Sequence, residues 1–145
     1  MLGGHQIYTD GWKSCEMSGK DYLGKSAKKC DVQDFISQLQ DIQSKLVVPM
    51  EYLLGFNEPW DTNPDLPLKY IDPADAAKYW GEYYIPTAKA LGLKLVTPTS
   101  IMDPKKADWM VTFLKSCWEL RDADENACDV ETIEVFAMHH YTCYY

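Results

Sequence analysis

The sequence predicts an α/β fold with parallel strands, on three observations. Short apolar runs at residues 51–57, 93–97 and 133–139 have the length of buried strands. Segments with the apolar spacing of amphipathic helices separate these runs. Each such segment is long enough to cross over between two parallel strands. A short apolar piece within residues 1–8 is expected to be the first strand and to end near residues 3–5. The expected order is then strand, helix, strand, helix, strand, helix, strand.

The N-terminal part is expected to hold this first strand, a loop and one helix. The polar, glycine-containing stretch 9–29 is expected to be the loop. Asp31 is a suitable N-cap for a helix over residues 32–45. The apolar stripe of this helix consists of Phe35, Leu39, Ile42 and Leu46.

Two Asp-Pro pairs mark the starts of the other helices. Asp72 should cap a helix over residues 73–91, because aspartate is favoured at the N-cap and proline at the first helical position. Pro86 should kink or split this helix, because proline lacks an N–H and its ring clashes with the preceding turn. Asp103 repeats the pattern before a helix over residues 104–121.

Composition excludes several classes of function. The 145 residues carry 22 acidic and 14 basic side chains, and the net charge of −8 leaves no basic face for nucleic acid or an anionic membrane. No apolar run is long enough to span a membrane. Five cysteines are typical of an exported, oxidised protein, and their odd number leaves at least one thiol without a partner in this chain.

Polar and aromatic side chains follow the ends of the predicted strands, where active groups of α/β folds lie. These stretches are residues 3–5, 57–60, 97–100 and 139–141. Together they offer a carboxylate, amides, hydroxyls, imidazoles and aromatic rings. Carbohydrate presents hydroxyls to polar groups and C–H faces to aromatic rings, so this composition indicates a sugar-binding edge.

Glu58 is the candidate acid or base at this edge. It lies between an apolar strand and Pro59, and partial burial there would raise its pKa toward that of a proton donor. The alternative is a turn glutamate that only solvates the end of the strand.

Segments in order along the chain resemble one known family. They read MLGG at 1–4, LLGFNEP at 53–59, DPADAA at 72–77, LVTP at 95–98, FLKSC at 113–117 and FAMHHY at 136–141. These segments resemble motifs of the glycosyl hydrolase catalytic-core family that includes glycoside hydrolase family 128, of the retaining clan A. The resemblance implies a partial (β/α)8 TIM-type barrel. Residues 1–145 would form an incomplete catalytic-core domain with about four β-α units, lacking the first and last barrel strands.

The resemblance also implies the activity of a retaining endo-β-1,3-glucanase-like hydrolase. Glu58 would be the general acid/base, which protonates the departing glycosidic oxygen and later deprotonates water. A retaining enzyme needs a second carboxylate about 5–5.5 Å away as nucleophile. In the family this is a glutamate downstream of the segment at 136–141, so the isolated chain is expected to be an inactive part of a longer enzyme.

By the same resemblance, a polar and aromatic set would bind the substrate. Its members are Asn57, Trp60, His139, His140 and Tyr141. Trp60 and His140 replace an aspartate and a tryptophan of the family pattern, which leaves the exact glycan open. A hydrogen-bonded core position is the alternative for His139, and packing that anchors a loop is the alternative for Trp60.

The matching cysteine positions imply a disulfide between Cys117 and Cys128. Cys15 and Cys30 could close the long first loop, and Cys143 would then be the odd residue. The alternative is that these cysteines are reduced and act as small buried hydrophobes. No cofactor is expected, and no spacing of Cys and His fits a metal site.

The expected partner is β-glucan or a related polysaccharide, and the expected location is extracellular or in the cell wall. The alternative function is a non-catalytic carbohydrate-binding or structural extracellular module on the same scaffold. A nucleotide-binding domain is disfavoured, because no glycine-rich phosphate loop follows a strand. The sequence does not predict an oligomeric state.

Overall fold

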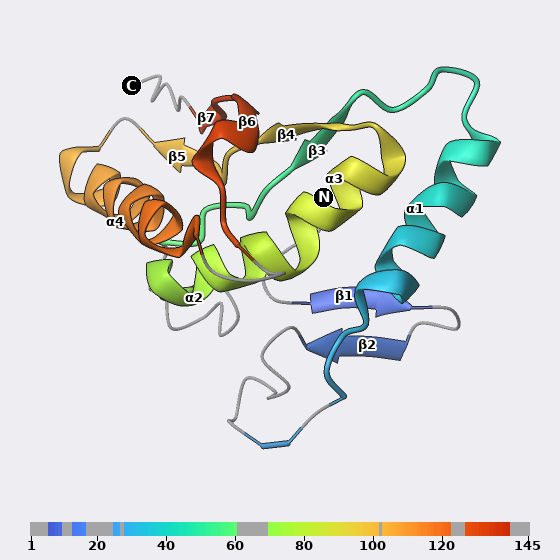
Figure 1. Ribbon diagram of the computed structural model, residues 1–145, viewed down its shortest axis with the longest axis horizontal. Coiled ribbons are helices and arrows are strands. Elements are labelled where there is room, and N and C mark those ends of the chain that lie inside the picture. The colour runs from blue at the N-terminus through green and yellow to red at the C-terminus, as the bar shows by residue number, and fades with distance from the viewer. Residues whose placement is uncertain are drawn as a thin grey trace, which may run out of the picture.

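The structure, a computed structural model, describes residues 6–9, 13–16, 25–26, 28–60, 70–101, 103–122 and 127–139, and the side chains of these residues except 6–9, 13–16, 100, 101 and 105. Helices and parallel strands alternate over the described residues (Figure 1), which confirms the predicted α/β class. The described strands form separate small sheets and no closed barrel.

A three-stranded parallel sheet lies at the centre of the fold. It consists of β3 (Tyr52–Leu54), β4 (Lys94–Val96) and β6 (Ile133–Val135), in the order β3-β4-β6. A second parallel pair follows from the same strands, because β5 (Ser100–Ile101) comes after β4 and β7 (Met138–His139) after β6. The parallel pairing predicted from the crossover lengths is therefore present.

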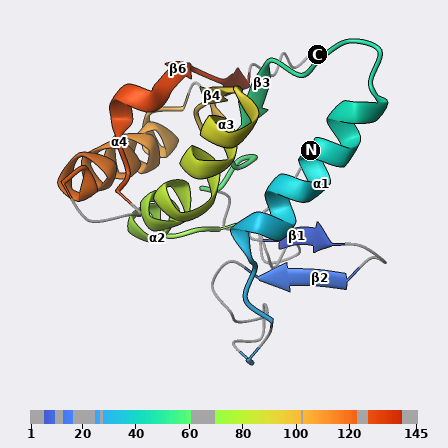
Figure 2. The ribbon, with the colours of Figure 1, turned by 45° about the vertical axis from the view of Figure 1, so that its right-hand side comes forward.

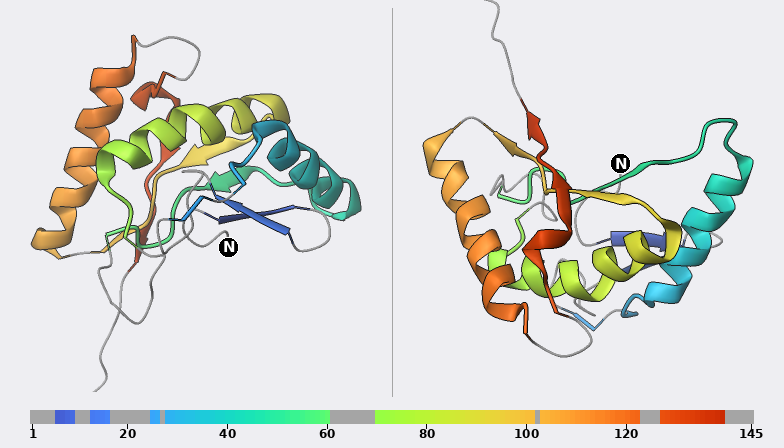
Figure 3. Two further views of the ribbon diagram at one scale, coloured as in Figure 1. Left: turned by 90° about the horizontal axis from the view of Figure 1, so that it is seen from below. Right: turned by 45° about the horizontal axis from the view of Figure 1, so that its top comes forward.

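Helices connect these strands and pack on one side of the central sheet (Figure 3). They are α1 (Val32–Lys45), α2 (Pro73–Tyr79), the π-helical segment η1 (Trp80–Tyr84), α3 (Ile85–Leu91) and α4 (Pro104–Leu120). A short 3-10 helix, η2 (Val130–Thr132), precedes β6. No described helix has the length and apolar character needed to cross a membrane.

Local signals set the helix ends as the sequence predicted. The carboxylate of Asp31 accepts a hydrogen bond from the Gln33 amide at 2.8 Å, and that of Asp72 accepts one from Ala74 at 2.9 Å. Each bond satisfies a donor in the first turn that has no partner within the helix. Gly92 ends α3 in the left-handed conformation, with φ 65°, which glycine adopts without a steric penalty.

The helix over residues 73–91 accommodates Pro86 without ending. The chain widens into η1 just before the proline, and the Ile85 amide donates to the carbonyl of Trp80, five residues back. Since Pro86 has no N–H and its ring would crowd the carbonyl four residues earlier, the wider turn relieves the conflict. The predicted kink or split therefore takes the form of a π-helical turn.

The prediction of a loop over residues 9–29 is wrong at residues 13–16. These residues form β2 (Lys13–Glu16), which pairs antiparallel with β1 (Gln6–Thr9) as a hairpin beside the start of α1 (Figure 2). The polar composition predicted a loop, but pairing with a neighbouring strand satisfies the backbone of a polar segment equally well. Residues 1–5, which include the expected end of the first strand, lie outside the described residues.

The last predicted strand, over residues 133–139, is interrupted. Between β6 and β7 the amide of Ala137 donates to the Thr97 hydroxyl at 2.9 Å. The Thr97 side chain thus accepts a hydrogen bond from a backbone amide that lies between the two short strands. Sequence periodicity cannot show this break, because it depends on a residue 40 positions away.

Aromatic rings fill the core between the helices and the sheet. Trp80 and Tyr84 are fully buried and stack with ring centroids 4.7 Å apart, and Phe113 meets Trp80 edge-on at 5.5 Å. Complete burial raises the pKa of the Tyr84 hydroxyl. Gly55 reaches this cluster from the end of β3: a Cβ there would lie 2.6 Å from a ring atom of Trp80. The segment that follows β3 therefore packs directly against the core.

Candidate functional site

Glu58 lies just past the carboxyl end of β3 in an uncommon backbone conformation. Its φ is 47°, and Glu58 is the sole non-glycine residue with positive φ among those described. The residue is buried, at 8% exposure, and its amide donates to the hydroxyl of Thr99 at 2.7 Å. The backbone N–H is thereby satisfied although it belongs to no strand or helix.

The carboxylate of Glu58 meets the imidazole of His139. The Glu58 Oε1 atom lies 3.0 Å from His139 Nδ1, although the residues are 81 positions apart. The Glu58 side chain is 11% exposed and the His139 side chain 31% exposed. His139 is therefore a partly exposed partner of the carboxylate and not a fully buried core histidine. The expectation that separate strand ends meet at one edge holds for these two residues.

The segment that leaves β4 forms hydrogen bonds to both chain segments that carry this pair. Thr99 donates its amide to the Phe56 carbonyl at 2.8 Å, and Thr97 donates its amide to the Val135 carbonyl at 2.9 Å. Sequence reasoning placed these threonines at a strand end but gave them no role. The available signal was a Thr-Pro-Thr run directly after a buried strand.

Trp60 is held in place by a lysine of α4. The Lys106 ammonium lies 3.9 Å from the centroid of the indole ring, so one face of the ring is covered. The indole nitrogen is buried with no hydrogen-bond partner among the described residues. Trp60 is half-buried and also packs against the hydrophobic core. The contact fits the alternative of a loop anchor, and the role of stacking platform stays a prediction. Sequence reasoning missed Lys106.

The remaining predicted site residues are only partly visible. Asn57 is half-buried beside Glu58, while His140 and Tyr141 lie outside the described residues. Among the residues that the structure describes, no group of three or more His, Cys, Asp or Glu side chains could hold a metal ion. The described part of the site therefore consists of a carboxylate, an imidazole, an amide and an indole.

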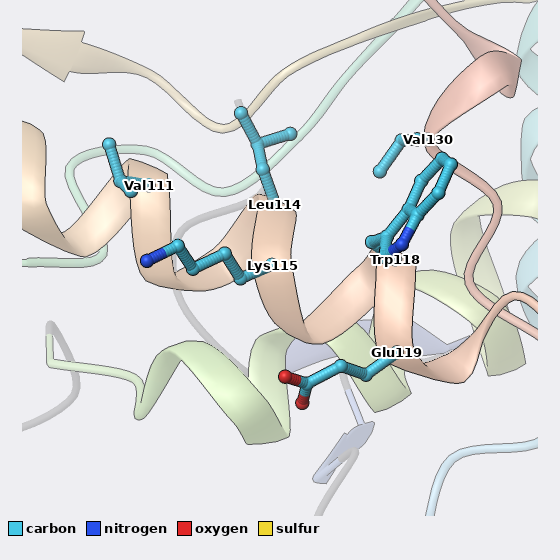
Figure 4. Close-up of a pocket in the computed structure, with 6 residues that line it drawn as sticks. All are labelled: Val111, Leu114, Lys115, Trp118, Glu119 and Val130. Atoms are coloured by element: carbon cyan, nitrogen blue, oxygen red, sulfur yellow. The ribbon is translucent and has the colours of Figure 1, made fainter.

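A pocket on the outer face of α4 lies apart from these residues (Figure 4). Its volume is about 430 Å³, and none of the predicted site residues that the structure describes lines it. The lining residues are Val111, Leu114, Lys115, Trp118, Glu119 and Val130. Trp118 is 54% exposed, and the Arg121 guanidinium lies 3.9 Å from the centroid of its ring.

A disulfide links α4 to the segment that follows it. Cys117 on α4 is bonded to Cys128 in the segment before η2, and this is the pair that the resemblance implied. Cys30 is also disulfide-bonded. The side chain of Cys15, its predicted partner, lies outside the described set, so the Cys15–Cys30 pairing stays a prediction.

Comparisons with known proteins give one result. A family model described as the glycosyl hydrolase catalytic core matches residues 25–144 of the chain. The match covers the described site residues, from Asn57 through His139. The comparisons with curated proteins and with solved structures give no match.

Proposed function

The chain belongs to the glycosyl hydrolase catalytic-core family, and we propose that Glu58 is the general acid/base of a retaining glycoside hydrolase. Membership of the family implies a carbohydrate substrate. The observation that carries the proposal is the contact of 3.0 Å between the buried Glu58 carboxylate and His139. Two ionisable groups from different strand ends, brought together at one edge of a parallel sheet, are what an acid/base site of this fold requires.

His139 gives the two oxygens of Glu58 different tasks in this proposal. With a proton on Nδ1, the imidazole donates to Oε1 and holds the carboxyl group in one orientation. Oε2 is then the oxygen that carries the exchangeable proton. It delivers the proton to the departing glycosidic oxygen and accepts one from the attacking water in the second step.

The nucleophile in this proposal is a glutamate outside the 145 residues. The parallel sheet would be part of a (β/α)8 barrel, in which that glutamate ends a neighbouring strand. Catalysis by the retaining route requires the two carboxyl groups to lie about 5–5.5 Å apart. The chain alone should accordingly bind a glycan but not hydrolyse it.

The proposed substrate is a β-1,3-glucan, met outside the cell or in the cell wall. The resemblance of the segment at residues 53–59 supports the substrate, and the Cys117–Cys128 disulfide supports an oxidising location. Trp60 and Asn57 flank Glu58 and would contact the sugar rings. The Trp60 face that Lys106 leaves open is the one available for stacking.

Two measurements test the proposal. The first titrates the 145-residue chain with laminari-oligosaccharides and follows backbone and side-chain NMR signals. We expect shifts at Asn57, Glu58 and His139, and none with malto-oligosaccharides. The second assays laminarin hydrolysis by the chain together with its native flanking sequence. In that form, Glu58→Gln should abolish hydrolysis while oligosaccharide binding persists.

The control variant is Glu134→Gln, which makes the same change at an exposed position of β6 and should leave hydrolysis unchanged. Near-normal rates in Glu58→Gln would remove the acid/base role. Binding of laminari-oligosaccharides without hydrolysis by any extended form would favour the alternative, a non-catalytic carbohydrate-binding module. The replacement of the family's aspartate by Trp60 is the observation that keeps this alternative in view.

A further inference from the structure

We propose that Thr97 and Thr99 are positioning residues that set the geometry of the Glu58–His139 pair. The inference concerns the three-residue segment Thr97–Thr99, which connects β4 to β5. The expected effect on catalysis rests on the proposed role of Glu58. The expected effect on the Glu58–His139 contact does not. Both threonines are buried, at 0% and 5% exposure, and both use their hydroxyls on a backbone amide of a neighbouring segment.

Thr99 holds the turn that carries Glu58. Its amide donates to the Phe56 carbonyl at 2.8 Å, and its hydroxyl accepts from the Glu58 amide at 2.7 Å. The same hydroxyl donates to the Phe56 carbonyl at 3.4 Å. Glu58 has φ 47°, a value that non-glycine residues rarely adopt without support from their surroundings. The bond to Thr99 gives its buried N–H a partner in that conformation.

Thr97 holds the segment that leads to His139. Its amide donates to the Val135 carbonyl at the end of β6, at 2.9 Å. Its hydroxyl accepts from the Ala137 amide, also at 2.9 Å. These two bonds hold the segment that connects β6 to β7, and His139 lies in β7. The imidazole thus reaches the edge of the sheet from a backbone that Thr97 fixes.

The short segment Thr97–Thr99 therefore forms hydrogen bonds to the chain on both sides of the pair, near Glu58 and near His139. Pro98, between the two threonines, is buried and has a restricted φ. Its nitrogen would lie 2.7 Å from a Cβ on Gly55, so it is also packed against the strand end that leads to Glu58. Glu58 and His139 are 81 residues apart in sequence, yet each is at most two residues from an amide that this segment binds.

A purely structural role makes a different prediction. Any buried threonine that satisfies an amide contributes to stability, and its loss would lower stability without changing the Glu58–His139 contact. A positioning role requires that contact to change. The two are separated by a measurement at His139, which neither threonine is shown to touch.

The test compares Thr99→Val with Thr99→Ser in the full 145-residue chain by NMR. Valine keeps the shape and removes the hydroxyl, whereas serine keeps the hydroxyl. In Thr99→Val we expect the Glu58 amide to exchange with solvent at least about tenfold faster, because it has lost its acceptor. We also expect the imidazole ¹⁵N signals of His139 to move toward their positions in Glu58→Ala. Thr99→Ser should restore both readouts.

Thr87→Val is the matched control. Thr87 is fully buried, and its hydroxyl has no hydrogen-bond partner among the described residues. The same substitution there should leave the Glu58 amide and the His139 signals unchanged. If Thr99→Val does not fold, Thr97→Val applies the test from the other side: the His139 signals should move while the Glu58 amide stays protected.

Unchanged His139 signals in a folded valine variant would overturn the proposal and leave the threonines with a structural role only. These readouts need no carbohydrate, so they stand or fall separately from the proposed function. In a form that hydrolyses β-glucan, Thr99→Val should lower kcat roughly 10- to 100-fold with little change in KM, because the misplaced acid acts mainly in the transition state.

Discussion

Two tryptophans in the helical layer show how differently the inner and outer sides of this fold are built. Trp80, in η1, is fully buried and packs against Tyr84 and Phe113. Trp118, near the end of α4, is 54% exposed and contacts the Arg121 guanidinium. The inner ring is enclosed by other aromatic rings, whereas the outer ring borders an open pocket.

The inner side of the helical layer supports the candidate site. Gly55 follows β3, three residues before Glu58, and a Cβ there would collide with both Trp80 and the Pro98 nitrogen. The inner aromatic cluster is therefore in contact with the segments that hold Glu58. Of the described site residues, none lines the pocket beside Trp118. Substitutions on the inner side should therefore alter the geometry of the site, and substitutions on the outer side should not.

The largest effect is expected from Trp80→Ala. Removal of the buried ring should lower the free energy of unfolding by about 3–5 kcal/mol, through lost burial and the cavity that remains. Urea unfolding followed by circular dichroism would measure it. Trp80→Phe is the control: it keeps a ring and removes an indole N–H that has no partner among the described residues, so it should cost less. Equal losses in both variants would contradict the packing argument.

An intermediate effect is expected from the disulfide on the inner side of α4. Cys117 and Cys128 are both fully buried and close a loop with a sequence separation of 11. Replacement of both by alanine should cost about 3 kcal/mol, since the unfolded chain regains the entropy of an open loop. For a chain of this size the thermal midpoint should fall by roughly 10 °C. A midpoint within about 2 °C of the parent, at equal reversibility, would contradict this expectation.

The smallest effect is expected from Trp118→Ala. The ring is largely exposed, and an exposed cation–π contact contributes only about 0.5–1 kcal/mol. The free energy of unfolding should therefore change by less than about 1 kcal/mol, and the NMR signals of Glu58 and His139 should not move. A loss above about 2 kcal/mol would show that the outer face is covered in solution, and the contrast between the two sides would then fail.

Much of the fold follows from local sequence signals. Asp31 and Asp72 cap helices where predicted, and Gly92 ends one, because the responsible contacts lie within a few residues. The parallel order of β3, β4 and β6 follows from the crossover lengths. The hairpin strand at residues 13–16 did not follow, because its polar residues carry no strand periodicity.

The candidate site was predictable in part. Glu58 could be singled out from its place between a strand and a proline, and its neighbour Asn57 with it. The sequence could not predict the contact of Glu58 with His139, the lysine that covers Trp60 or the threonine bonds. Each joins residues at least 38 positions apart, and no local pattern encodes such a meeting.

Local sequence signals set the elements and the chemistry that they can offer: an acidic α/β chain with a glutamate and a histidine at strand ends. How these groups meet depends on the packing of distant segments. The positive φ of Glu58, the break between β6 and β7 and the separation of 3.0 Å from carboxylate to imidazole depend on the strand end at residues 97–99. Caps and helical periods act over a few residues, whereas buried hydrogen bonds form only once distant segments have packed together.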